Sequence, residues 1–256
     1  MNINLKLISL LLVVFFISLS AVSADDTTQV NNTDNINEIE TEQPTVEPKG
    51  FIELQNQIWH SQSGDTIELD SDYIQDGQRN WISVDRTITI DGKGHTLDGN
   101  NSAIFYVTQT ASHVEIRNAI FINGHRSAGG AIIADAGSDY LTLKNCTFKD
   151  NQATTSNVGG AVYIKSSFST ITDSTFENNF APSSGGAIRL EGGNSHTITN
   201  NIFIGNKANG NLGGAINALG HNIKIANNTF TKNIAGRDGG AISIEGSKVA
   251  EIGTGN

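Results

Sequence analysis

The stretch Ile198-Thr-Asn-Asn-Ile-Phe203-Ile-Gly-Asn206, followed by Gly213-Gly-Ala-Ile216, decides the fold of this chain. The first motif occurs four times without gaps, and a fifth copy that begins at Ile116 matches as far as its phenylalanine. The phenylalanines lie 27, 28, 27 and 27 residues apart, at Phe121, Phe148, Phe176, Phe203 and Phe230. The Gly-Gly-Ala motif falls between them and begins at Gly129, Gly159, Gly185, Gly213 and Gly239. Two motifs in fixed phase at this period predict stacked repeats.

The chemistry of each repeat selects the kind of solenoid. Short runs of alternating β-branched residues occur without any helical periodicity. The leucine pattern of leucine-rich repeats and a six-residue period are both absent. About 27 residues accommodate three short strands and three turns. We therefore predict an all-β fold, a right-handed parallel β-helix, with the hand following from the bias of parallel β crossovers.

Stacking assigns the repeat positions to columns that run along the solenoid, with about 4.8 Å between equivalent residues. The phenylalanines should form an inward apolar column, and so should Ile116, Leu143, Ile171, Ile198 and Ile225. A ladder of amide side chains is expected at a bend, formed by Asn118, Asn145, Asp173, Asn200 and Asn227. The Gly-Gly pair should permit a positive φ or a close approach between coils.

The strand after each Gly-Gly should also alternate between the core and the outside. Two of its columns should line the core: Ile132, Val162, Ile188, Ile216 and Ile242, and then Ala134, Ile164, Leu190, Ala218 and Ile244. The column between them varies widely, so we expect it to face solvent: Ile133, Tyr163, Arg189, Asn217 and Ser243.

The first 49 residues precede the repeats. Residues 1–24 have the layout of a secretory signal peptide, and an uncleaved membrane anchor is the alternative. Residues 25–49 carry seven acidic residues against Lys49, so we expect a disordered spacer. Residues 50–256 would then form the β-helix domain, secreted or at the cell surface, with no membrane span after cleavage. The net charge of −10 argues against a nucleic-acid partner.

The two ends of the domain differ. A helix from Ile52 to Ser61, with Phe51, Leu54, Ile58 and Trp59 on one face, should cap the first coil. Strands are expected at 66–69, 82–84, 87–90 and 103–107, and residues 70–81 should form a side loop. At the other end, Val249 to Ile252 is a possible strand of an incomplete coil, so open edges could pair end to end with another copy.

These motifs resemble known families. The alternation of Gly-Gly-Ala-Ile with Phe-x-x-Asn is similar to the repeats of polymorphic membrane proteins of intracellular bacteria. The entry region, Gly64-Asp-Thr-Ile67 and Ile82 to His95, resembles adhesin-like surface proteins of methanogenic archaea. The resemblance covers residues 51–256 and implies a surface-exposed β-helix that contacts other cells or polymers. We expect a protein that attaches to cells or polymeric glycans, or one with a structural role in the envelope, and no enzyme. The segment from Asp91 to Asp98 also resembles a turn of pectate lyases and polygalacturonases that serves as scaffold there.

A polysaccharide lyase or hydrolase is the alternative function, because many β-helices have such activity. The polygalacturonase pattern of an Asp pair beside Gly-His-Gly and Arg-x-Lys is absent. We therefore expect no catalytic site and no cofactor. The six histidines lack metal-ligand spacing, so no metal site is expected either.

A binding surface should instead lie on a flank of the helix. Tyr163, Arg189 and Asn217 of the outward column are the candidate binding residues, where an aromatic ring and a guanidinium could hold a glycan. Cys146 should be a small filler in a column with no chemical requirement. Of the four sequons, Asn31 and Asn100 should be accessible to glycosylation. Asn145 and Asn227 should be hidden in the amide ladder.

Overall fold

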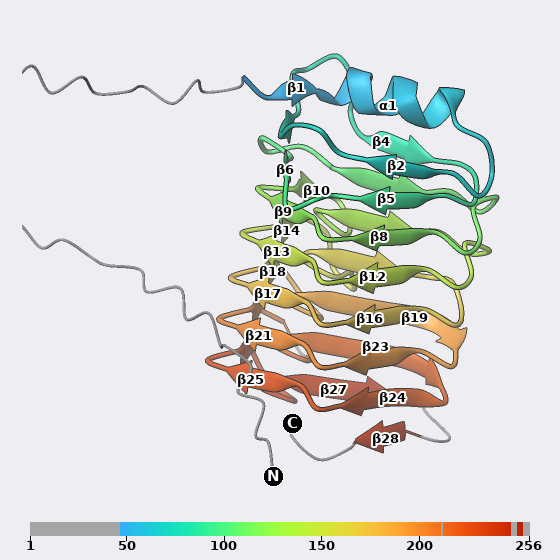
Figure 1. Ribbon diagram of the computed structural model, residues 1–256. Helices are drawn as coiled ribbons and strands as arrows, with labels where there is room; N and C mark the ends of the chain where they lie inside the picture. Colours follow the sequence, from blue (N-terminus) through green and yellow to red (C-terminus); the bar gives the residue numbers. More distant parts are fainter. Residues whose placement is uncertain (1–46, 211, 247–249, 253–256) are drawn as a thin grey trace, which may run out of the picture. The chain divides into compact units, whose positions relative to one another are not determined.

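A computed structural model describes residues 47–210, 212–246 and 250–252. The expected signal peptide and the spacer up to residue 46, with its sequon at Asn31, lie outside the described residues. Figure 1 shows the described part as a stack of coils with one helix at its N-terminal end. In this part of the chain, all strand pairs are parallel and form four sheets that run along the stack. This is the expected β-helix.

The Ile sheet contains the strand that carries the Ile-x-Asn motif. Its strands are β2 (Thr66–Glu68), β5 (Thr89–Asp91), β8 (Glu115–Arg117), β12 (Thr142–Lys144), β16 (Thr170–Thr172), β20 (Thr197–Thr199), β24 (Ile223–Ala226) and β28 (Ala250–Ile252).

The Phe sheet follows after a bend and carries the stacked phenylalanines. Its strands are β1 (Lys49–Gly50), β3 (Tyr73–Ile74), β6 (Thr96–Asp98), β9 (Ile120–Ile122), β13 (Thr147–Lys149), β17 (Thr175–Glu177), β21 (Ile202–Ile204) and β25 (Thr229–Thr231).

The short-strand sheet, which the sequence did not predict, comes next in the coil. Its strands are β10 (His125–Arg126), β14 (Gln152–Ala153), β18 (Phe180–Ala181), β22 (Lys207–Ala208) and β26 (Ile234–Ala235).

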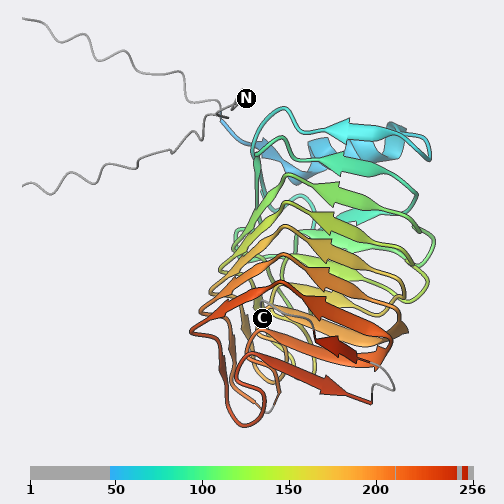
Figure 2. The same cartoon turned by 60° about the horizontal axis from the view of Figure 1, so that its bottom comes forward.

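The Gly-Gly sheet completes the coil and begins just after the glycine pair. Its strands are β4 (Ile82–Val84), β7 (Phe105–Val107), β11 (Ile132–Ala134), β15 (Val162–Ile164), β19 (Ile188–Asn194), β23 (Ile216–His221) and β27 (Ile242–Glu245). Figure 2 shows how the chain bends sharply between successive strands of one coil.

The core consists of the apolar columns that the repeat predicts. Phe148 pairs in register with Phe121 on one side and Phe176 on the other, and their ring centroids lie 4.9 and 4.7 Å apart. The stack continues through Phe203 to Phe230 at 4.9 Å. Each such ring pair contributes about 0.5–1.5 kcal/mol beyond the burial of its surface. The Ile column and both core columns of the Gly-Gly sheet are buried as far as Ile225 and Ala218.

The expected amide column hydrogen-bonds between coils at Asn145 and Asn118, but it is not the buried ladder that the sequence predicts. Asn118, Asn145, Asp173, Asn200 and Asn227 have positive φ values between 51° and 59°, and all but the half-buried Asn118 are exposed. The left-handed backbone turns each of these side chains outward and the next one inward. The buried ladder is therefore formed by the following column, where the Asn201 Nδ2 donates to Asn228 Oδ1 at 3.0 Å. Cys146 and Ser174 belong to this ladder, since the Cys146 N–H donates to Ser174 Oγ at 3.0 Å.

A second buried ladder closes the bend after the Phe sheet. Its members are Asn151, Asn179, Asn206 and Asn233, the last residue of each Phe-x-x-Asn motif. Each amide group satisfies backbone groups that the bend would otherwise leave unpaired inside the fold. The two ladders tie successive coils together along both bends of the Phe sheet.

The glycine pair serves both purposes that the sequence suggested. Gly185 has a φ of +63°, in the left-handed region that favours glycine. A Cβ on Gly186 would collide with the Gly214 carbonyl and the backbone of Lys207 in the neighbouring coil. The first glycine therefore makes the turn, and the second lets the short-strand sheet pass directly against the Gly-Gly segment.

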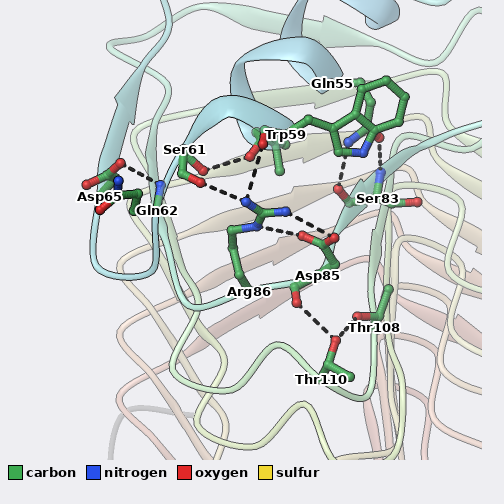
Figure 3. Close-up of polar contacts among 11 residues, drawn as sticks. Gln55, Trp59, Ser61, Gln62, Asp65, Ser83, Asp85, Arg86, Thr108 and Thr110 are labelled. Atoms are coloured by element: carbon green, nitrogen blue, oxygen red, sulfur yellow. Dashed lines mark hydrogen bonds and ion pairs between the residues drawn. The ribbon is translucent and has the colours of Figure 1, made fainter.

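The N-terminal helix α1 (Phe51–His60) covers the first coil, as expected, with Phe51, Leu54 and Ile58 buried. The Gln55 side chain, also fully buried, accepts from the Ser83 N–H at 2.6 Å and donates to the Ser83 carbonyl at 3.1 Å. It thus supplies the hydrogen bonds of a neighbouring strand to the edge strand β4 (Figure 3). Trp59, by contrast, is exposed rather than on the buried face.

Arg86 ties the end of the helix to the next turn. Its Nη1 donates to the Ser61 carbonyl at 2.7 Å and to the Trp59 carbonyl at 3.4 Å (Figure 3). Its Nε donates to Asp85 at 2.8 Å. Since the last carbonyls of a helix lack intrahelical partners, the guanidinium acts as a C-terminal cap.

Two expected boundaries change in the structure. Residues 70–81 are not only a side loop, because Tyr73 is fully buried in β3 of the Phe sheet. Lys49, placed in the disordered spacer by its sequence, pairs with Tyr73 in the register of β1 and β3. Its Nζ also lies 2.6 Å from Asp70.

Candidate functional site

The expected outward column of the Gly-Gly sheet is not solvated. Tyr163, Arg189 and Asn217 do point away from the main core, but none of them is more than 8% exposed. The chain after each Phe-x-x-Asn motif makes an excursion that covers this face. Ala153 and Ala181 of the short-strand sheet pack there with Tyr163 in a second, smaller apolar cluster. The three candidate binding residues are therefore largely covered by the short-strand sheet, and they support the residues beside them more than they contact solvent.

The accessible groups of this face lie beside that column. Trp81 stands at its N-terminal end, where the Arg126 guanidinium lies 4.3 Å from the indole ring and 5.3 Å from the ring of Tyr106. The Tyr106 hydroxyl donates to Asp135 Oδ2 at 2.7 Å. The Lys165 Nζ approaches the other oxygen of Asp135 at 3.3 Å.

The same network continues along the next coils. Lys165 also lies 5.6 Å from the centre of the Tyr163 ring, and the Arg189 Nε donates to Glu191 at 3.3 Å. Lys165 and Glu191 are about two-fifths exposed, so they form the solvent edge of the network. We call this continuous set of contacts the polar strip: Trp81, Tyr106, Arg126, Asp135, Tyr163, Lys165, Arg189 and Glu191.

The pKa shifts follow from these contacts. The hydrogen bond from Tyr106 lowers the pKa of Asp135, and Lys165 lowers it further against the effect of partial burial. Burial raises the pKa of Tyr163 to about 12, and the nearby Glu191 carboxylate adds to that rise. At neutral pH, the strip therefore presents an ionised Asp135 and a neutral Tyr163.

A second unusual feature is a column of exposed rings in the turn between the Gly-Gly sheet and the Ile sheet. His113, Tyr140 and Phe168 occupy equivalent positions of three coils and all have positive φ, between 55° and 63°. Their rings stack at 4.4 and 4.7 Å. Tyr140 and Phe168 are 44% and 40% exposed. We call these three residues the turn column.

A shallow cleft of about 390 Å³ lies outside the bend between the Ile and Phe sheets, lined in part by Lys93, Asn118 and Asn145. Asn145 donates to Asn118 Oδ1 at 2.8 Å and is exposed, as is Asn227. The prediction that the amide ladder hides the sequons at Asn145 and Asn227 is therefore wrong. Asn145 and Asn227 are as accessible to modification as Asn100, which is also exposed at a turn.

Cys146, the one cysteine of the chain, lies in an unreactive environment. Cys146 is buried, and burial raises the pKa of its thiol to about 12, which makes it unreactive at neutral pH. Among residues 47–210, 212–246 and 250–252, no three His, Cys, Asp or Glu side chains gather to hold a metal ion. In the same described residues, no helix is long and apolar enough to cross a membrane.

The fold and its repeat define this protein as a right-handed parallel β-solenoid. The sequence profile described as the right-handed beta helix region matches residues 56–249, which is most of the chain. The chain therefore belongs to the right-handed β-helix family. Searches of curated proteins and of solved structures found no match to it.

Proposed function

We propose that this protein is a secreted or cell-surface, adhesin-like β-helix that attaches to cells or polymeric glycans. The polar strip is the observation that carries this proposal. It follows the Gly-Gly sheet in two neighbouring columns. Tyr106, Tyr163 and Arg189 belong to the outward column of β7, β15 and β19, and the charged Asp135, Lys165 and Glu191 each lie two residues after that column in successive coils. The other support comes from the sequence, which has a signal-like start and resembles adhesin-like surface proteins.

The geometry of the strip suits a long ligand. Strands spaced about 4.8 Å apart offer a row of groups along the solenoid axis, so a polymer could contact several coils at once. Tyr163 contacts Lys165, and Arg189 donates to Glu191. These contacts hold the two exposed side chains in place, which limits the conformational entropy lost on binding. Lys165 and Glu191 supply exposed donors and acceptors for hydroxyl groups.

A double variant tests the strip. Lys165→Ala with Glu191→Ala should weaken binding to cells or to immobilised polysaccharides about tenfold or more, measured by surface plasmon resonance across a panel of polymers. The matched control is Lys149→Ala with Glu177→Ala, a pair at 3.5 Å and of similar exposure on the outer side of the Phe sheet. Equal binding by the two double variants and the unaltered protein would contradict the role of the strip.

A polysaccharide-acting enzyme remains the second candidate because two carboxylates share the strip. Asp135 and Glu191 are two coils apart, about 10 Å at the backbone. Inverting glycoside hydrolases hold their two carboxyl groups about 6.5–9.5 Å apart, a separation that side chains two coils apart can reach. The lowered pKa of Asp135 keeps this carboxyl ionised. An ionised carboxylate cannot donate a proton to a leaving group. Product release from a polysaccharide that Glu191→Gln abolishes would favour the enzyme over the adhesin.

A further inference from the structure

The rings of the turn column occupy backbone positions that are unfavourable for large side chains. Non-glycine residues with positive φ are mostly Asn and Asp, and large side chains at such positions cost of order 1–3 kcal/mol each. The same turn position in the next two coils holds Ser195 and Asn222, at φ values of 60° and 55°. The turn itself therefore forms without rings, and three consecutive rings are not needed to build it.

The column is also held rigidly. The backbone N–H of His113 donates to the Asp139 carbonyl at 2.8 Å, in the next coil. Tyr140 donates in the same way to the Ser167 carbonyl at 3.0 Å, and Phe168 to the Asn194 carbonyl at 2.8 Å. Each ring is thus fixed one coil from its neighbour, at the spacing of a stacked pair.

Phe168 ends the series with one face uncovered by the column. The next position belongs to Ser195, whose side chain is too small to cover a phenyl ring, and Phe168 is 40% exposed. A flat, apolar ring placed beyond Phe168 would continue the stack. Its surroundings would be polar, because the Asn194 N–H donates to Ser167 Oγ at 3.2 Å and the Ser167 N–H donates to Asp139 Oδ1 at 2.7 Å. The Asp139 carboxylate disfavours an anionic ligand.

We propose that the open face of Phe168 is a stacking subsite for one pyranose ring of a neutral glycan. Such a ring has a flat C–H face for Phe168 and peripheral hydroxyls for the neighbouring serine and asparagine groups. A phenyl ring of a partner protein would carry no hydroxyl groups to pair with the exposed Asn194 side chain and the half-buried Ser167. The subsite rests on the proposed function and deepens it. The turn also follows β15 and Lys165 directly in the chain, so it lies at the edge of the polar strip.

The test uses the whole protein and cellohexaose as the probe, with affinity measured by calorimetry. Phe168→Asn should weaken binding about three- to tenfold, because one stacked ring is lost. It should leave the melting temperature unchanged or raise it, since asparagine tolerates the left-handed turn. The control is Trp59→Gln, which removes an equally exposed aromatic side chain from α1.

The outcomes separate the subsite from the function. Unchanged cellohexaose affinity in Phe168→Asn overturns the subsite. If the melting temperature of this variant also falls, the Phe168 ring stabilises the fold and does not bind a ligand. In either case, polymer binding that depends on Lys165 and Glu191 leaves the proposed function standing. A protein that binds neither cellohexaose nor any polymer of the panel overturns both.

Discussion

At the scale of single residues, Asn179 joins three coils through one amide group. Its Oδ1 accepts from both the N–H and the Nδ2 of Asn151, each at 3.0 Å. Its Nδ2 donates to Asn206 Oδ1 and to the Phe148 carbonyl, each at 2.9 Å. All of these groups are buried, so a loss of the amide leaves several of them without partners.

Asn179→Ala should therefore lower the free energy of unfolding by about 2–5 kcal/mol, since each unsatisfied buried group costs about 1–3 kcal/mol. Chemical denaturation measures the effect. Asn178→Gly is the control, because Asn178 is its exposed neighbour with positive φ and Gly205 holds the equivalent place in the next coil. A loss in Asn178→Gly as large as that in Asn179→Ala would show that the ladder does not determine stability.

His196 makes stability depend on pH. It is only 1% exposed, its Nδ1 has no hydrogen-bond partner, and burial lowers its pKa below the usual 6.5. The Gly192 carbonyl and then Asp139 act on this pKa in the opposite direction. The unfolded chain therefore takes up a proton at a higher pH than the folded protein does. Stability is full above about pH 6.5 and falls as the pH drops toward the lowered value.

The measurement is the melting temperature between pH 7.5 and pH 5. His196→Asn should remove most of the decline in the upper part of this range, because asparagine does not titrate. Ser169→Asn places the same side chain at the equivalent buried position one coil earlier. It should keep the decline of the unaltered protein. A decline that persists in His196→Asn would mean that other groups cause it.

At the scale of the elements, the columns of the Ile, Phe and Gly-Gly sheets could be predicted from the sequence because their apolar residues repeat in phase. The side chains that point inward at the bends could not be predicted in this way. At the bend after the Ile sheet, the position that repeats most faithfully is Asn or Asp, and it is exposed. A left-handed backbone selects asparagine as strongly as a buried ladder does. Repetition alone therefore cannot tell which of two adjacent residues points inward.

The second bend has the opposite pattern. There the outer position varies among Asp150, Asn178, Gly205 and Lys232, while the inner position is asparagine in all four Phe-x-x-Asn copies. The short-strand sheet was missed for another reason, because its strands have two residues each and carry no periodic signal. Since this sheet covers the variable column, the side chains of Tyr163 and Arg189 are buried where the sequence suggested that they were solvated.

At the scale of the whole molecule, each coil contacts its neighbours through the same set of columns. Phe176 pairs with Phe203, Thr170 with Thr197 and Ile188 with Ile216, each in the next coil. The stability of such a stack is close to a sum over coils and the interfaces between them. Removal of one coil should therefore lower the free energy of unfolding by the contribution of that coil and one interface, and leave the other coils folded.

Deletion of residues 176–202 removes one coil and joins Thr175 to Phe203, which keeps every column in register. We expect this variant to fold, with the denaturant m-value smaller by about a seventh. Circular dichroism and guanidinium unfolding measure the result. Deletion of residues 176–189, half of that length, places core positions opposite bends and should leave the chain unfolded. If the shorter deletion folds as well as the longer one, the registered columns do not hold the stack together. The longer deletion also removes Arg189 and Glu191, so a folded variant that still binds polymer as tightly would place the binding surface elsewhere on the solenoid.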